Sequence, residues 1–187
     1  MRPTHLVLLG LVALAAAACG GGTAKLGTTQ SAPKAPSGNV AAAGTASTPG
    51  RCTTGNLSLR LGSAGGAAGS IYEPLVFTNR GNATCTLSGY PGVAFVAPNS
   101  GKQVGAAASR NPQHAAKTIT LAPGKAASAT LQVANEANYP AATCTPTTVS
   151  GLRVYPPGAT TAKYVAFTHP QKACSTSVHQ LTVQAVA

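Results

Sequence analysis

The chain has 187 residues, with 13 Lys and Arg against two acidic residues, which gives a formal net charge of +11. It contains no Asp, and its acids, Glu73 and Glu136, stand more than 60 residues apart. Glycosidases need two carboxylates in one cleft, and Ser-His-acid hydrolases need one beside a histidine. This composition therefore argues against both classes of enzyme, and we expect a non-catalytic protein without a cofactor.

The first residues have the pattern of an export signal. Arg2 is followed by an apolar run over residues 6–18, which suits a signal-peptide core and is too short for a membrane-spanning helix of about 20 residues. Four alanines directly precede Cys19, as small residues do in a bacterial lipobox. We expect residues 1–18 to be a signal peptide and Cys19 to be lipidated, which anchors the protein on the extracytoplasmic face of the cell membrane. An ordinary secretory signal cut elsewhere is the alternative.

Residues 19–50 differ in composition from the rest of the chain. Gly, Ala, Ser, Thr and Pro dominate, and Leu26 and Val40 are the only large aliphatic residues. Such a segment cannot bury enough apolar surface to offset the entropy lost on ordering. We predict a disordered linker that separates the lipid anchor from a folded domain.

Residues 51–187 have the size of one domain, and short apolar alternations recur along them between Gly, Pro and Asn residues. No window has the apolar spacing of three and four that indicates a long helix. Roughly seven to nine short strands predict an all-β domain, an antiparallel β-sandwich of the immunoglobulin-like type, with a partly closed barrel as the alternative. Predicted strands include residues 57–61, 118–121, 127–133, 152–154, 165–167 and 181–185.

A hairpin is predicted near the middle of the chain. Alternate residues are apolar in the runs 75–77 and 85–87, so each run has one apolar face when it is extended. Residues 78–82 lie between them and contain Asn and Gly, which tolerate turn conformations. The pattern predicts two paired strands joined by this turn.

Four cysteines remain in the domain once Cys19 is set aside, and an even number in an oxidising compartment indicates two disulfides. Four cysteines permit three pairings. We favour Cys52 with Cys85 and Cys144 with Cys174, because each pair closes a loop of about 30 residues, a constraint worth roughly 3 to 4 kcal/mol. Metal binding by these thiols is the alternative, although the chain has no CxxC pair.

Several of these features together resemble a known family. The most specific is the block N-x-G…C-T-L-x-G-Y-P-G over residues 79–92, with Cys52 ahead of it and Cys144 ahead of the run LRVYP at 152–156. They resemble the actinobacterial family known as domain of unknown function 4232, over nearly all of residues 51–187. The resemblance implies an exported, often lipid-anchored domain with paired cysteines and a β-rich fold. It implies no activity.

Positive charge is the remaining functional signal, because the chain keeps twelve Lys and Arg after removal of Arg2 with the signal peptide. A basic domain outside the membrane meets anionic lipid headgroups and wall polymers, and each Lys or Arg near such a surface contributes about 1 kcal/mol. Arg80 in the predicted turn and Lys125 after a Pro-Gly turn are the candidate contacts. Without interleaved aromatic residues we expect no nucleic-acid partner, and the sequence identifies no protein partner. A merely solvated basic surface is the alternative.

Metal carriage and hydrolysis are the two alternatives to simple binding. His114, His169 and His179 could serve a copper or zinc carrier, but two of them neighbour prolines in predicted loops and carboxylate support is missing, so we expect no metal site. An envelope hydrolase using Glu73 or Glu136 requires one of these acids in a cleft near a histidine. The leading hypothesis is a non-catalytic cell-envelope lipoprotein that presents a basic β-sandwich as a binding or structural module.

Overall fold

The structure is a computed structural model that describes residues 48–187. The predicted signal peptide (1–18), Cys19 and all but the last three residues of the predicted linker lie outside the described residues. Within residues 48–187 the chain is mostly β, and no helix has both the length and the apolar character to cross a bilayer. The strands are β1 (Leu57–Leu61), β2 (Gly65–Ala67), β3 (Ser70–Asn79), β4 (Cys85–Ser88), β5 (Gly92–Val96), β6 (Gln103–Val104), β7 (Ser109–Arg110), β8 (Thr118–Leu121), β9 (Ala126–Ala134), β10 (Pro146–Tyr155), β11 (Lys163–Cys174) and β12 (Leu181–Val183). The helical elements are η1 (Thr54–Asn56), η2 (Glu136–Asn138) and α1 (Ala141–Cys144).

The largest sheet has the strand order β1-β3-β9-β12-β7, and β2 pairs with the first residues of β3. Its ladders are antiparallel except for the one between β12 and β7, which is parallel. In β3 the side chains of Leu75 and Phe77 are fully buried, whereas Val76 between them is partly exposed. This alternation with a period of two places one face of the sheet against an apolar core.

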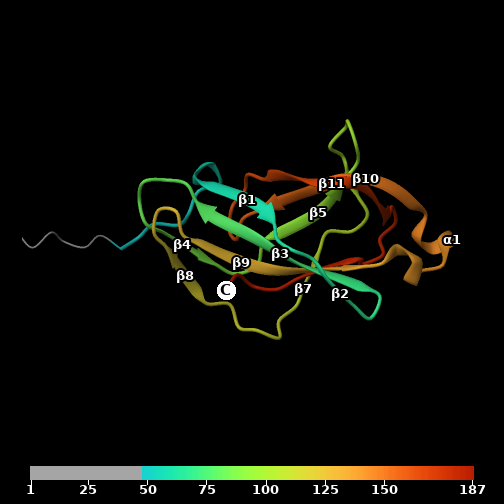
Figure 1. The fold of residues 1–187 in the computed structure, drawn as a ribbon, viewed down its shortest axis with the longest axis horizontal. Helices are drawn as coiled ribbons and strands as arrows, with labels where there is room; N and C mark the ends of the chain where they lie inside the picture. The colour runs from blue at the N-terminus through green and yellow to red at the C-terminus, as the bar shows by residue number, and fades with distance from the viewer. Residues whose placement is uncertain (1–47) are drawn as a thin grey trace, which may run out of the picture. The chain divides into compact units, whose positions relative to one another are not determined.

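The second sheet has the order β11-β10-β5-β6 and is antiparallel throughout. One hydrophobic core joins it to the largest sheet, since Phe95 of β5 and Leu152 of β10 belong to the same buried cluster as Leu75 and Phe77. Figure 1 shows β5, β10 and β11 running alongside β3 and β9. The two sheets therefore pack on each other through their apolar faces.

The hairpin predicted within residues 75–87 is wrong. β3 and β4 do not pair; β4 pairs with β8 in a separate two-stranded sheet. The buried amide of Asn79, at the end of β3, donates hydrogen bonds to the carbonyls of Ala83 (2.8 Å) and Leu121 (2.9 Å) and accepts one from the Gly81 N–H (2.9 Å). These bonds direct the chain out of the largest sheet and toward β8, so the connection crosses between sheets instead of folding back.

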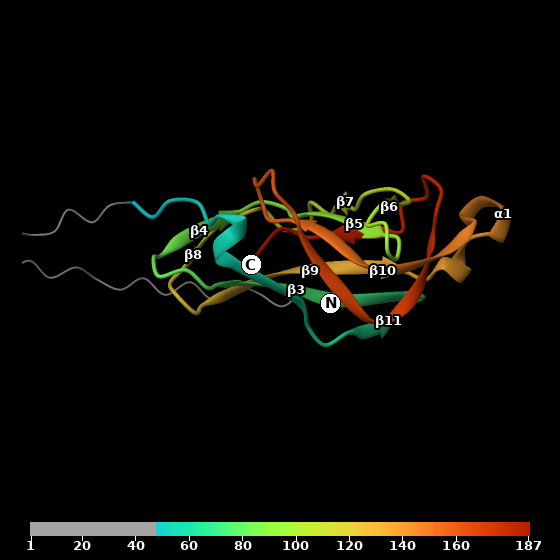
Figure 2. The same cartoon turned by 90° about the horizontal axis from the view of Figure 1, so that it is seen from above.

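Two disulfides fasten opposite ends of the domain. Sulfur–sulfur bonds join Cys52 to Cys85 and Cys144 to Cys174, which are the predicted pairs. Figures 1 and 2 both show β4, which carries Cys85, at one end and α1, which carries Cys144, at the other. We call these the β4 end and the α1 end. The described chain enters at the β4 end, where the Cys52 N–H donates to the carbonyl of Thr86 on β4 (2.9 Å).

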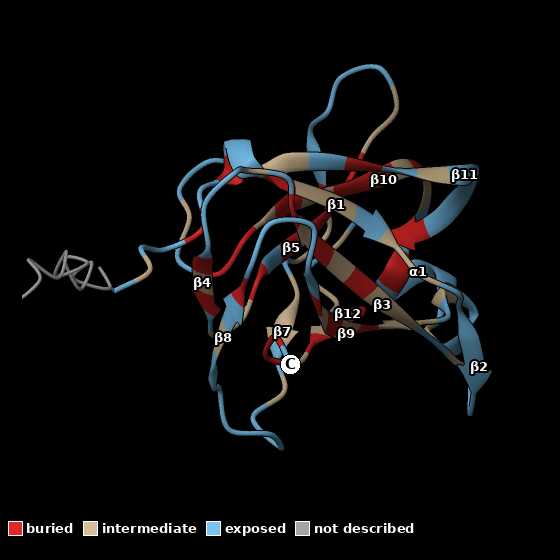
Figure 3. Cartoon of the chain, turned by 60° about the vertical axis from the view of Figure 1, so that its left-hand side comes forward, coloured by how far each residue is buried: buried red, intermediate tan, exposed pale blue. Residues whose placement is uncertain are grey.

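The α1 end also contains a buried amide side chain. Gln180 is only 4% exposed; its side-chain oxygen accepts from the Cys174 N–H (2.9 Å) and its NH₂ donates to the carbonyl of Ala134 (2.8 Å). It thus ties the last residue of β11 to the last residue of β9. The short strand β2 projects beside this end and is exposed along its whole length (Figure 3).

Candidate functional site

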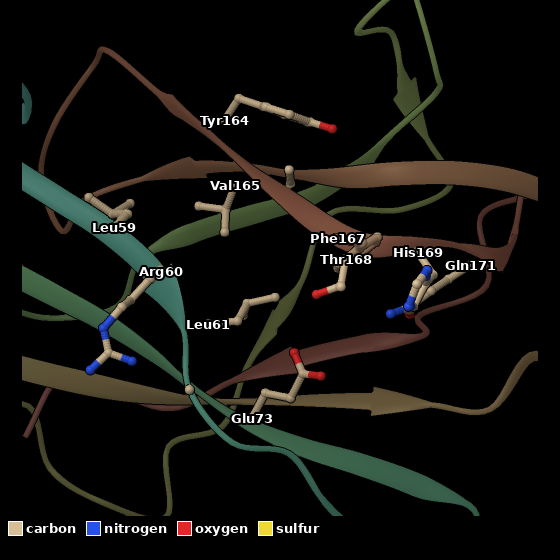
Figure 4. Close-up of a pocket in the computed structure, with 12 residues that line it drawn as sticks. Leu59, Arg60, Leu61, Glu73, Tyr164, Val165, Phe167, Thr168, His169 and Gln171 are labelled. Atoms are coloured by element: carbon tan, nitrogen blue, oxygen red, sulfur yellow. The ribbon is translucent and has the colours of Figure 1, made fainter.

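A groove lies between β1, at the edge of the largest sheet, and β11, at the edge of the second sheet. Its cavity volume is about 500 Å³. The apolar part of its lining continues the core, because Leu59, Leu61 and Phe167 are partly buried against the core cluster and Val165 belongs to it. Its polar lining side chains, shown in Figure 4, are Arg60, Glu73, Tyr164, Thr168, His169 and Gln171.

A bulge in β11 forms one wall of the groove. Ala166 pairs with Gly151 of β10 and the next pair is Gln171 with Val149, so residues 167–170 of β11 stand opposite a single residue of β10. Pro170, which has no N–H to donate, suits such a break in an edge strand. Bulges of this kind redirect side chains and are common beside functional sites.

The opposite wall is the outer edge of β1, which within residues 48–187 pairs with β3 alone. The N–H of Gly62, just after the strand, donates to a carbonyl of β3. Because alternate residues of an antiparallel edge strand point their N–H and C=O groups to opposite sides, those of Leu57, Leu59 and Leu61 point away from β3. The Lys163 ammonium on β11 donates to the Leu57 carbonyl and joins the two walls at one end of the groove.

Glu73 is the acidic group of the groove. It lies two residues before Leu75 and four before Phe77, so its side chain shares the core-facing side of β3 and is partly buried. This burial raises the pKa of Glu73 above its ordinary value. No cation among residues 48–187 counteracts the effect: Figure 4 shows the guanidinium of Arg60, which lines the same groove, directed away from the Glu73 carboxylate. In the described part of the chain, the groove thus contains a half-buried carboxylate whose charged form lacks a cationic partner.

Arg80 and Lys125, the candidate contacts for an anionic surface, lie outside the groove and beside each other. The N–H of Asn79, directly before Arg80, donates to the Lys125 carbonyl (2.9 Å). Both side chains are exposed, and the Arg80 guanidinium donates to the hydroxyl of Ser58 (3.2 Å). The structure therefore brings these two basic residues together at the β4 end, where the chain enters the domain.

The three histidines occupy different surroundings. His169 lines the groove, His114 lines a separate cavity of about 490 Å³ near the C-terminus, and His179 lies 3.1 Å from the hydroxyl of Ser109. Among residues 48–187, no group of three or more His, Cys, Asp or Glu side chains is arranged to hold a metal ion. Glu136 lies in η2, away from the groove lining, so Glu73 with His169 is the acid and histidine that share a cleft.

Sequence reasoning missed the groove itself. The runs at 57–61 and 165–167 are predicted as strands, but nothing in their local pattern says that their edges meet. One signal was available: Pro170 follows a strand-like run, and proline within such a run indicates an edge strand or a bulge. A second was the spacing of Glu73 from Leu75 and Phe77, which places an acid on an apolar face.

Comparison with known proteins gives a family and no closer relative. A family model described as Domain of unknown function (DUF4232) matches residues 52–187. No curated protein and no solved structure matches the chain.

Proposed function

The chain belongs to this DUF4232 family, and from that premise we propose that it is a non-catalytic, lipid-anchored binding protein of the cell envelope that takes its ligand in the groove between β1 and β11. One observation carries the proposal: the core of the domain is left open at this edge. A concave, partly apolar site with a few converging polar groups is the usual form of a binding pocket. Here it is built on two strands and not on long loops, which favours a preformed site.

We also infer that the two larger sheets form an immunoglobulin-like sandwich. The inference is supported by their shared core and by their mostly antiparallel ladders. In this arrangement β1 and β11 are the edge strands on the same side of the sandwich, and the groove is the gap between them.

The lipid anchor is supported by the sequence pattern ahead of Cys19. Replacing Cys19 with Ala should abolish incorporation of a labelled fatty acid and move the protein from the membrane fraction to the soluble fraction, because the remaining chain has no other site for acylation in this pattern. Fractionation and fatty-acid labelling of cells expressing either form measure both effects. If the Cys19→Ala protein still takes up label and sediments with membranes, the anchor proposal is wrong.

We further propose that the β4 end contacts anionic headgroups or wall polymers through Arg80 and Lys125, since these exposed residues lie together where the chain enters the domain. Replacing both with Gln should weaken binding to vesicles rich in anionic lipid, and added salt should weaken wild-type binding in the same way. The control replaces Lys102 and Lys172 with Gln, which removes the same amount of positive charge elsewhere on the domain. Equal losses from both pairs would assign the effect to net charge alone.

Ligand binding in the groove is tested by obstructing it. Leu61→Arg places a long charged side chain among the apolar lining residues, whereas Leu59 and Phe167 remain to hold the fold. Protein, wall-polymer and lipid fractions of the envelope should each be tested for retention on the immobilised full chain, in wild-type and Leu61→Arg form, at low and high salt. We expect the wild-type protein to retain one of these fractions at both low and high salt. The Leu61→Arg protein should not retain that fraction. Retention that Leu61→Arg leaves unchanged would refute a ligand site in the groove.

The hydrolase alternative has one specific observation in its favour, because Glu73 and His169 line the same groove. General acid catalysis uses a carboxyl group whose pKa is raised, as burial does for Glu73. The alternative predicts turnover of a wall or lipid substrate by the wild-type protein and its loss in Glu73→Gln. Binding without turnover, in the fraction identified above, favours the non-catalytic function.

A further inference from the structure

The edge of β1 offers backbone hydrogen-bonding groups to the groove. Leu59 and Leu61 each direct one N–H and one C=O away from β3, as the Gly62 bond to β3 requires. At Leu57 this edge already forms a hydrogen bond, because the Leu57 carbonyl accepts from the Lys163 ammonium of β11. An uncovered strand edge of this kind is a template on which another extended chain can add.

A strand added to this edge would direct alternate side chains into the groove. At the level of Leu59 and Leu61 these side chains would meet Val165 and Phe167 of β11. Phe167 is held in place by the ring of Phe95, with 6.2 Å between ring centroids in an edge-on arrangement. This part of the groove therefore suits apolar side chains.

In the register of β1 with β3, Glu73 lies at the next core-facing position of β3 before Leu75, past the end of β1. Leu61 pairs with Leu75 and Gly65 of β2 pairs with Tyr72, so Glu73 lies beside the step formed by Ser63 and Ala64. Both residues of this step are exposed and neither lines the groove, whereas Glu73 does. A side chain entering there would meet the Glu73 carboxylate, which no cation of the domain neutralises. A Lys or Arg side chain has the complementary charge and the length to reach a partly buried acid.

We propose that the groove binds an extended peptide segment of a partner protein, added antiparallel to the free edge of β1, with a Lys or Arg beside Glu73 and apolar residues two and four positions later against Leu61, Leu59 and the β11 wall. The antiparallel direction follows from the greater stability of that pairing. This inference rests on the proposed function, since it names the ligand class of the same site.

The probe is a fluorescein-labelled peptide, acetyl-Thr-Lys-Thr-Val-Thr-Val-Thr-amide, titrated with the full chain and followed by fluorescence anisotropy. In this antiparallel register the two inward Val residues exchange hydrogen bonds with Leu61 and Leu59, and the Lys lies past the end of β1 beside Glu73. N-methylation of the two Val nitrogens should therefore weaken binding at least about tenfold. N-methylation of two Thr nitrogens, which point away from β1, should leave binding unchanged. Hydrogen exchange should show protection of the Leu59 and Leu61 amides on binding.

The charge pairing is tested by a variant and a matched control. Glu73→Gln should weaken binding of the Lys peptide about tenfold and leave a norleucine peptide unaffected, while Glu136→Gln, outside the groove, should change neither. Equal effects of the two N-methylation patterns, or no effect of Glu73→Gln, would overturn the proposal. If no peptide binds while Leu61→Arg still abolishes retention of an envelope fraction, the peptide inference is overturned and the groove remains a binding site for another class of ligand.

Discussion

The two ends of the domain are built from similar parts, a disulfide and a buried amide, but their disulfides differ in their relation to the main core. At the β4 end, Cys52 and Cys85 belong to the main core, and Asn79 closes the end with three side-chain hydrogen bonds. At the α1 end, Cys144 and Cys174 are buried but lie outside that core, and neither lines the groove between β1 and β11. The disulfide and the hydrogen bonds of Gln180 therefore hold the α1 end, where the cross-link lies outside the main core.

Removal of each disulfide should produce the largest difference. The bonds span 33 and 30 residues, so both stabilise the fold by about 3.7 kcal/mol in the chain-entropy model. Cys52→Ala with Cys85→Ala also removes atoms from the main core, so we expect a loss of about 5 kcal/mol, against about 4 kcal/mol for Cys144→Ala with Cys174→Ala. Urea unfolding of both double variants measures this, and a larger loss at the α1 end would contradict the comparison.

A close backbone approach also holds the α1 end. Gly105 has a φ of +66°, and a Cβ added there would lie 2.4 Å from the Cys174 carbonyl oxygen. Gly124, in the turn at the β4 end, has a similar φ of +77° but open space around it. We expect Gly105→Ala to cost about 3 kcal/mol and Gly124→Ala about 1 kcal/mol, because only the first adds a clash to the strain of a positive φ. Thermal unfolding compares them, and similar losses would mean that the contact with Cys174 relaxes without cost.

The buried amides allow a finer comparison of the two ends. Asn79→Ala leaves three backbone groups without their partner, whereas Gln180→Ala leaves two. Since each unsatisfied buried group costs about 1 kcal/mol or more, we expect losses of about 3 and about 2 kcal/mol. Urea unfolding gives the totals. Hydrogen exchange should show the faster amides near β4 for Asn79→Ala and near α1 for Gln180→Ala, and the reverse pattern would contradict the division into two ends.

Features set by local pattern could be predicted from the sequence. The strands at 57–61 and 118–121 were predicted with the bounds that β1 and β8 have, because alternation with a period of two depends only on neighbouring residues. The disulfide pairs were also predicted, since short loops close at a lower cost in entropy than the crossed pairings.

The connection after β3 and the groove could not be predicted in this way, because both depend on residues distant in sequence. The Asn79 amide bonds to Gly81 and Ala83 near the expected turn, but it also donates to the Leu121 carbonyl, 42 residues away. The groove needs Leu61 and Phe167 on edges that meet only once two sheets have packed. A local pattern contains no information on which strand edges become neighbours.

Glu73 gives the smallest predicted effect and the sharpest test of why the groove between β1 and β11 is open. Burial raises its pKa above the ordinary 4.5, so the folded state binds the proton more tightly than the unfolded state does. The free energy of unfolding should therefore decrease as the pH rises from 4.5 through the raised pKa, and this loss persists at neutral pH. Glu73→Gln should remove that decrease and slightly stabilise the protein at pH 7, whereas Glu136→Gln serves as the control.

Urea unfolding of the wild type and both variants at pH 4 and pH 7 measures the effect. If Glu73→Gln instead destabilises the protein at pH 7, the carboxylate has a favourable partner within the fold and its charge needs no ligand. A residue whose charge lowers stability while it strengthens binding of a basic peptide is explained by the ligand and not by the fold. The two measurements on the same variant therefore decide whether the groove exists for binding.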